Sequence, residues 1–328
     1  MKTRSLLLST WVFITLVLVI AVVSLLGGTA RAAWPKRPVE FVISAGTGGG
    51  ADRYARFMVG LNIKNKYIHE AMLPVNRTGG AGAVAMNYVL KQKGNGYVIL
   101  ITLNSFITTP LFQSLPWSFR DFTPIALLAL DNFPLWVHKD SPWKTIDDFL
   151  AEARKRSITV GGTGSKQEDE IVFRAIEKLA KTKPFKYVPY KGGGAVAKSL
   201  VGKHSEATVN QVSEAGPFYP KFVRPLVVFQ DNRLTMKGYR DVPTGKEAGI
   251  PFSYNMMRGI FAPPAIPAEA KNGLVGLFRK ISKDKDWLAF LNKAGLKPTF
   301  TTGDKLMSFL EDFEKVHKNI MRGQGWIK

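Results

Sequence analysis

The sequence contains no cysteine, which excludes disulfide bonds, thiolate metal sites, a cysteine nucleophile and a lipid-modified cysteine anchor. Histidine is scarce, and the four histidines stand far apart. Neither the H-E-x-x-H pattern of zinc proteases nor the G-x-S-x-G pattern of serine hydrolases occurs. These absences leave few residues for metal or acyl-transfer catalysis, and we expect no bound metal.

Acidic residues are outnumbered, with 25 Asp and Glu against 46 Lys and Arg, and the formal net charge is +21. Such a field attracts anions. Nucleic acid is not the expected partner, because zinc-finger spacing, an RNP-like aromatic run and an arginine-rich helix are all missing.

The N-terminus has the pattern of a secretory signal peptide over residues 1–32. Lys2 and Arg4 precede an apolar run that ends at Leu26, and the small-residue sequence Ala30-Arg31-Ala32 follows. We therefore expect export to the periplasm. A retained membrane anchor is the alternative, because about twenty apolar residues are enough to cross a bilayer.

A strand, a glycine-rich turn and a helix follow one another four times, which predicts βαβ units, mainly parallel sheets and an α/β fold. The turns are Gly46–Gly50, Gly79–Gly82, Gly161–Ser165 and Gly192–Gly194. Each following helix is predicted to bury one apolar face. The faces are, in chain order, Phe57, Met58 and Leu61 in the first helix, Val84 and Tyr88 in the second, Ile171, Val172, Ala175, Ile176 and Leu179 in the third, and Val196 and Leu200 in the fourth. Ligands of open α/β sheets bind beyond the carboxyl ends of the strands, where these turns are expected.

Two of the turns resemble nucleotide-binding motifs, but each lacks a defining residue. Residues 46–51 match G-x-G-x-x-A, yet the following strand ends at Asn76, where an acid should hold the ribose. Residues 192–199 miss the phosphate-binding loop because Ala197 stands where glycine is required. We expect no cofactor.

The glycine turns expose backbone N–H groups at helix N-termini, an arrangement that binds anions. A single turn of this kind would indicate only a tight connection, but four at one sheet edge favour a binding site. Asp52 and Glu168 lie in the first turns of their helices, where an acid commonly stabilises the helix.

Several segments together resemble the periplasmic solute receptors of the tripartite tricarboxylate transporter family, also called Bug receptors. The matching segments are Trp34–Val39 (Y-P-x-R-P-I in the family), Ala45–Asp52 (A-G-x-G-G-x-x-D), Asn76–Gly82 (N-K-P-G-x-G-G), Gly94–Tyr97 (P-D-G-Y), Val188–Gly192 (V-P-Y-K-G) and Asp241–Gly249 (D-V-P-T-x-x-E-A-G). The sequence departs from the family pattern at three positions, Thr78, Ala81 and Met257. Met257 directly precedes Arg258-Gly259.

The resemblance implies a two-lobed periplasmic-binding-protein fold, the Venus-flytrap fold, type II-like, without catalysis. The long apolar stretches Pro124–His138 and Ser253–Pro264 are expected to pass between the lobes as hinges, so residues 34–136 and 254–328 would build one lobe and residues 137–253 the other. Such a receptor, a monomer, would capture a di- or tricarboxylate or an aromatic acid and deliver it to integral-membrane transporter subunits.

The resemblance also implies ligand contacts, carried over by position. They are Ala45, Gly46, Thr47, Gly48, Gly49, Asp52, Gly80, Ala81, Gly82, Asn104 and Ser105 in one lobe, with Thr163, Gly164, Ser165, Lys191, Gly192, Gly193 and Asn210 opposite. Two alternatives stay open. One is an exported α/β enzyme that uses Asp52 or Glu168 as a general acid or base, and the other is an orphan receptor that serves sensing.

Overall fold

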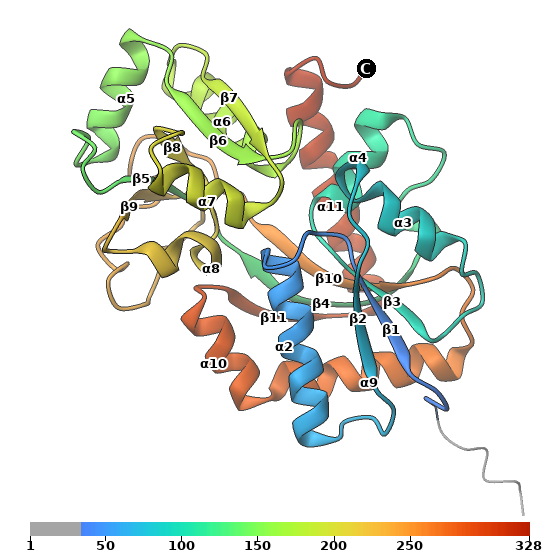
Figure 1. Ribbon diagram of the computed structural model, residues 1–328. Helices are drawn as coiled ribbons and strands as arrows, with labels where there is room; N and C mark the ends of the chain where they lie inside the picture. Colours follow the sequence, from blue (N-terminus) through green and yellow to red (C-terminus); the bar gives the residue numbers. More distant parts are fainter. Residues whose placement is uncertain (1–33) are drawn as a thin grey trace, which may run out of the picture.

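The computed structural model describes residues 34–328, so the predicted signal peptide lies outside the described residues. Two β-sheets, each covered by helices, make up the molecule (Figure 1). The predicted α/β fold is confirmed. Within residues 34–328, no helix combines the length and the apolar character needed to cross a membrane.

The first sheet has six strands in the order β11-β4-β10-β3-β1-β2. It is mixed: β1, β2 and β3 run parallel, whereas β10 is antiparallel to β3 and β4, and β11 is antiparallel to β4. The strands are β1 (Val39–Ile43), β2 (Met72–Asn76), β3 (Val98–Thr102), β4 (Thr123–Asp131), β10 (Met256–Ala262) and β11 (Lys297–Thr301).

The second sheet has five strands in the order β7-β6-β8-β5-β9. Here β6 is parallel to β7 and β8, and β5 is antiparallel to β8 and β9. The strands are β5 (Pro134–His138), β6 (Thr159–Thr163), β7 (Lys186–Tyr190), β8 (Ala207–Thr208) and β9 (Val223–Val228).

Helices cover both sheets, and we call each sheet with its helices a lobe. The first lobe contains α2 (Gly50–Asn65), α3 (Ala83–Leu90), α4 (Ser105–Gln113), α9 (Ala268–Lys283), α10 (Lys285–Lys293) and α11 (Gly303–Gly323). The second contains α5 (Ile146–Lys155), α6 (Glu168–Ala180), α7 (Gly193–Val201) and α8 (Val212–Ala215). Apolar side chains from α2 and α9 pack on one face of the first sheet, and those from α3, α4 and α11 pack on the other.

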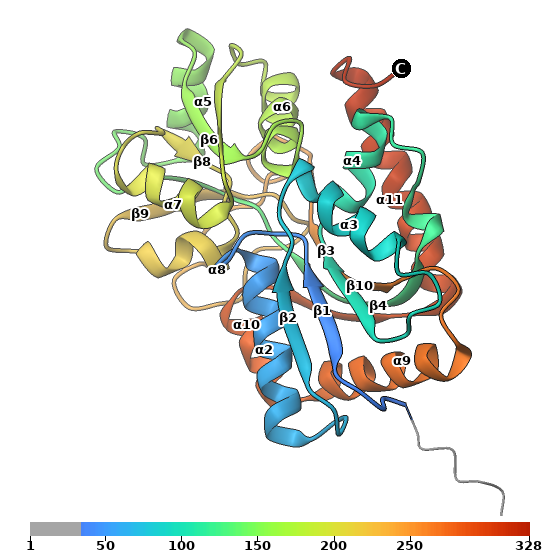
Figure 2. The same cartoon turned by 45° about the vertical axis from the view of Figure 1, so that its right-hand side comes forward.

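The chain crosses between the lobes twice, and one helix adds a third connection. It leaves the first sheet at Asn132 and Phe133, between β4 and β5, and returns between β9 and β10. The end of α11 and the residues after it reach the second lobe, where Ile320 and Trp326 pack against that lobe's core (Figures 1 and 2). The lobe limits expected from the sequence remain a prediction; the limit between residues 136 and 137 falls inside β5.

Three predictions from the glycine pattern were wrong in detail. Gly161 and Gly162 lie within β6 instead of in the turn. Close packing requires glycine at both positions, because a Cβ atom would meet Ser205 Oγ at 2.5 Å or Tyr187 Oη at 2.3 Å. Val84 is half exposed, since α3 is apolar on most sides and buries Ala85, Met86 and Val89 instead. The other predicted helix faces are buried or partly buried, apart from Leu179, which is exposed.

Candidate functional site

A cavity of about 580 Å³ lies between the two lobes, where the carboxyl ends of several strands meet. The first lobe lines it with Ser44, Ala45, Gly46, Gly49, Gly50, Ala51, Thr78, Gly79, Ala81, Gly82, Leu103, Ser105, Met256 and Arg258. The second lobe adds Thr163, Gly164, Ser165, Gln167, Glu168, Tyr190, Lys191, Gly192, Gly193, Gln211 and Glu214. Glycine is common because the main chain itself forms much of the wall.

Most of the predicted contact residues lie on this wall, although the contacts themselves remain a prediction. Those on the wall are Ala45, Gly46, Gly49, Ala81, Gly82, Ser105, Thr163, Gly164, Ser165, Lys191, Gly192 and Gly193. The others, Thr47, Gly48, Asp52, Gly80, Asn104 and Asn210, lie outside the lining.

Asp52 folds the first glycine turn and does not face the cavity. Its carboxylate accepts hydrogen bonds from the Gly48 N–H at 2.9 Å, from Asn76 Nδ2 at 3.0 Å and from Arg56 Nε at 2.8 Å. Burial alone would raise the pKa of Asp52, but these donors together hold it below its usual value. Asp52 therefore stays ionised and fully engaged, which suits a structural role. Gly48 has a φ of 80°, so this turn also needs glycine for its backbone shape.

The two predicted asparagines hold parts of the wall in place from behind. Asn104 Nδ2 donates to Asn255 O at 2.9 Å, and Asn104 Oδ1 accepts from the Met257 N–H at 2.8 Å, which ties the start of α4 to β10. Asn210 Nδ2 donates to Gly193 O at 3.0 Å and to Glu214 Oε2 at 3.2 Å. Both side chains are buried and position residues that line the cavity.

Arg258 in β10 lines the cavity but was not predicted. Its guanidinium forms a buried ion pair with Asp131, whose Oδ2 also accepts a hydrogen bond from Tyr54 Oη at 3.0 Å. The guanidinium also lies 4.7 Å from the centre of the Tyr54 ring. Gly50 packs on it so closely that a Cβ atom there would lie 2.6 Å from Arg258 Nη2. The sequence did contain a signal for Arg258, because it directly follows Met257, one of the three positions that depart from the family pattern.

Two acidic side chains of the second lobe accept hydrogen bonds from the first lobe at the edge of the cavity. Oε1 of Glu168 accepts a 2.6 Å hydrogen bond from the N–H of Ser105, and Oε1 of Glu214 accepts a 3.3 Å bond from the N–H of Gly50. Ser105 and Gly50 are the first residues of α4 and α2, so each acid meets the positive end of a helix. Burial raises the pKa of both carboxyl groups.

The start of α7 faces the cavity with a free donor. The N–H of Gly193 has no hydrogen-bond partner among the described residues. A Cβ atom at Gly193 would lie 2.0 Å from the Glu214 carboxylate, so only glycine allows this close packing. The free N–H at a helix N-terminus suits an anionic group of a bound molecule.

Residues 59–326 match the model of the tripartite tricarboxylate transporter family receptors. The match covers most of the chain and both lobes. The chain belongs to this receptor family.

The receptor also resembles individual proteins of known sequence or structure. A UPF0065 protein from the tcbD-tcbE intergenic region of a Pseudomonas species is 28% identical over 274 residues, which are 81% of this chain and 80% of the relative. The solved structure of Rpa4515 from R. palustris with adipate matches with a TM-score of 0.82 and 22% identity, covering 89% of this chain and 98% of that one. MatC from Rhodopseudomonas palustris with bound malate matches with a TM-score of 0.75 and 22% identity, covering 88% and 99%. These structures confirm the two-lobed fold.

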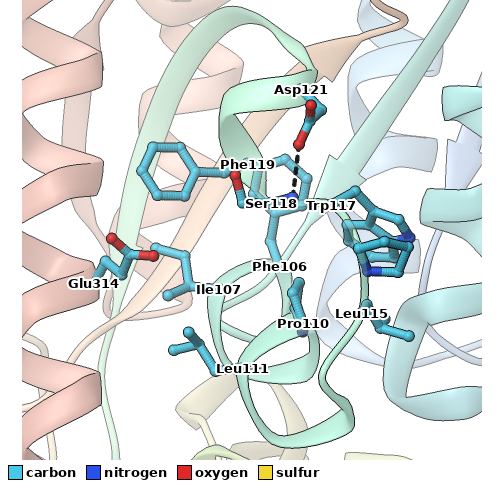
Figure 3. Close-up of a pocket in the computed structure, with 11 residues that line it drawn as sticks. Phe106, Ile107, Pro110, Leu111, Leu115, Trp117, Ser118, Phe119, Asp121 and Glu314 are labelled. Atoms are coloured by element: carbon cyan, nitrogen blue, oxygen red, sulfur yellow. Dashed lines mark hydrogen bonds between the residues drawn. The ribbon is translucent and has the colours of Figure 1, made fainter.

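A second hollow of the receptor, about 400 Å³, lies on the outer side of the first lobe between α4, α11 and residues 115–121 (Figure 3). Its described lining is mostly apolar and includes no lysine or arginine. Its two acids are already bound: Asp121 accepts from the Ser118 N–H at 2.8 Å, and Glu314 pairs with Arg120 at 3.1 Å. This hollow therefore offers nothing that would hold an anion, unlike the cavity between the lobes.

Proposed function

We propose that this receptor captures a small organic carboxylate between its lobes and delivers it to the integral-membrane subunits of a tripartite tricarboxylate transporter. The observation that carries the proposal is the cavity of about 580 Å³ lined by glycine turns of both lobes. Its volume is in the range of small-molecule sites.

Hydrogen-bond donors at the cavity and the basic character of the chain support an acidic ligand, although the wall also carries the acids Glu168 and Glu214. Lys191 lines the cavity together with Arg258, which is paired with Asp131. The Gly193 N–H at the start of α7 has no hydrogen-bond partner among the described residues. The whole chain carries a net charge of +21, which raises the concentration of small anions near its surface. Two relatives with the same fold hold adipate and malate, and both ligands are dicarboxylates.

We further propose that the ligand contacts include the predicted residues on the cavity wall and that the ligand has at least two anionic or strongly polar ends. One end would meet the first lobe and the other the start of α7. A ligand held by both lobes favours the closed form, because only that form makes both sets of contacts. Hinge motion near Pro124–His138 and Ser253–Pro264 would then close the lobes, and X-ray scattering should record a contraction on binding.

Catalysis is not part of the proposal. Asp52, one of the two candidate acids for an enzyme, has its carboxylate engaged with Gly48, Asn76 and Arg56 away from the cavity. Glu168 accepts a hydrogen bond from the N–H of Ser105 but lines the cavity, so recovery of the ligand unchanged after long incubation distinguishes the receptor from an enzyme. The proposal includes a monomeric receptor in the periplasm after removal of residues 1–32.

The test is ligand-observed NMR with a panel of di- and tricarboxylic acids and neutral sugars. We expect the signals of at least one acid to broaden on addition of the receptor, and the same acid to be recovered unchanged after long incubation. Conversion of the acid into a product would favour the enzyme. Binding of sugars but of no acid would contradict the proposal.

A further inference from the structure

The two acids of the cavity wall, Glu168 and Glu214, differ in how many partners they have. The Glu214 carboxylate accepts from the Gly50 N–H and from Asn210, and the Gln211 amide lies 2.6 Å from its Oε2. Its two oxygens are therefore both engaged by the protein.

Glu168 has acceptor capacity left at the cavity. Among the described residues, its carboxylate accepts hydrogen bonds from the Ser105 N–H and from its own main chain. A carboxylate offers about four lone-pair sites on two oxygens. Because Glu168 lines the cavity, the remaining capacity is open to a bound molecule.

Among the described residues, no lysine or arginine forms an ion pair with Glu168, although the charge of Arg258 acts on its carboxylate. Arg258 is paired with Asp131, and the other cation of the lining, Lys191, has an exposed side chain at the rim. Glu168 itself is 2% exposed, and burial raises the pKa of its carboxyl group. A buried carboxylate in this setting is stabilised when a ligand donates a hydrogen bond to it.

We infer that Glu168 determines specificity by accepting a hydrogen bond from a hydroxyl or ammonium group on the carbon chain of the ligand. The receptor then prefers hydroxy- or amino-dicarboxylic acids to the unsubstituted parent acids. This inference rests on the proposed function. An unsubstituted dicarboxylate places methylene groups against Glu168 and leaves the free oxygen without a partner, which costs binding free energy.

A purely structural role is the competing explanation, because Glu168 also joins the lobes through Ser105. The two roles predict different results. A structural residue affects all ligands alike, whereas a specificity residue affects only the ligands that carry the donor.

The experiment is calorimetric titration with two matched series: succinate, malate and aspartate, and glutarate, 2-hydroxyglutarate and glutamate. We expect the substituted acids of the better-binding series to bind about tenfold or more tightly than the parent. In Glu168→Gln this ratio should fall to about threefold or less, since the charge is lost and the amide is a weaker acceptor.

The matched control is Glu170→Gln. Glu170 lies in the same first turn of α6 and is 8% exposed, but it accepts from the Lys166 N–H and from Arg174 and does not line the cavity. The Glu170→Gln variant should show the same ratio of affinities for substituted and parent acids as the unaltered receptor.

Each outcome decides one question. If Glu168→Gln weakens parent and substituted acids equally, Glu168 is structural and the inference is wrong. If the unaltered receptor binds succinate and glutarate as tightly as their substituted forms, the inference fails even where the variant does not fold. Both results leave the proposed function standing, whereas the absence of binding by every acid tested, including longer and tricarboxylic ones, contradicts that function itself.

Discussion

The backbone N–H of Ser105 in the first lobe donates a 2.6 Å hydrogen bond to the carboxylate of Glu168 in the second lobe. Glu214 and the Gly50 N–H repeat this arrangement at the start of α2. The lobes thus meet through carboxylates placed at the positive ends of helices. Because both acids line the cavity, a ligand has to fit around contacts that also hold the lobes together.

The packing of Gly193 on Glu214 can be tested with two adjacent glycines. Gly193→Ala places a Cβ atom 2.0 Å from the Glu214 carboxylate, whereas a Cβ atom at Gly194 meets nothing within 4 Å. We expect Gly193→Ala to displace Glu214, destabilise the protein by about 1–3 kcal/mol and weaken ligand binding about tenfold or more. Gly194→Ala should leave affinity unchanged and stability equal or slightly higher. Thermal unfolding and calorimetry check both, and equal behaviour of the two variants would contradict this packing.

Gly49 tests whether the first glycine turn touches the ligand. Its φ of −72° and ψ of 168° suit any residue, and a Cβ atom would lie 3.2 Å from Gly46 O, so a small adjustment admits a side chain. Gly49→Val should therefore fold, as judged by circular dichroism, and should lose at least about tenfold in affinity by blocking the cavity wall. Gly48→Val should instead impair folding, because Gly48 has a φ of 80°. Unchanged affinity in a folded Gly49→Val protein would remove this turn from the ligand site.

The ion pair of Asp131 and Arg258 is expected to be sensitive to loss of one partner. Asp131→Asn leaves a buried guanidinium without its anion, which costs about 3–5 kcal/mol of unfolding free energy. The exposed pair of Lys315 and Asp312 is the control, and Asp312→Asn should cost about 0.5 kcal/mol or less. Urea unfolding measures both. A loss below about 1 kcal/mol in Asp131→Asn would show that Arg258 finds another partner.

His317 gives the stability a defined pH dependence. It is fully buried; Tyr254 Oη lies 2.7 Å from its Nε2, and its Nδ1 lies 2.7 Å from Phe313 O. Burial lowers the pKa of His317 from 6.5 to about 4, so the neutral form is native and protonation favours unfolding. Its contribution of about 3 kcal/mol is complete above pH 6.5 and is lost as the pH falls towards 4.

His317→Gln removes this titration while keeping polar atoms near Tyr254. The difference in unfolding free energy between the unaltered protein and the variant should therefore shrink as the pH falls from 6.5 to 4. Urea titrations at several pH values measure it. A constant difference across this range would mean that the pKa of His317 is the same in the folded and the unfolded protein.

The sequence predicted the cavity wall best where a strand runs directly into a glycine turn. A local pattern locates Ala45, Gly46 and Gly49, which closely follow β1, and Lys191 to Gly193, which directly follow β7. Glu214 and Arg258 gave no such pattern. They come from a four-residue helix and from a strand far along the chain, and only the packing of the two sheets brings them to the cavity.

Asp52 shows the opposite error, in which a local pattern pointed to the site and the side chain turned away. The motif Ala45–Asp52 contains both cavity residues and the acid that folds their turn. Its partners Gly48 and Arg56 are near in sequence, but Asn76 is brought from β2 by the parallel pairing of β1 with β2. The structural role of Asp52 therefore depends on the pairing of β1 with β2, which a local sequence pattern does not show.

The most direct test of the central claim is calorimetric titration of the receptor with the tightest-binding dicarboxylate and with its monoamide. The account predicts that the diacid binds about tenfold or more tightly, since a second charge-assisted contact spans the cavity between the lobes. Equal affinity of the monoamide, or equal affinity of a neutral sugar, would contradict an acid held at both ends.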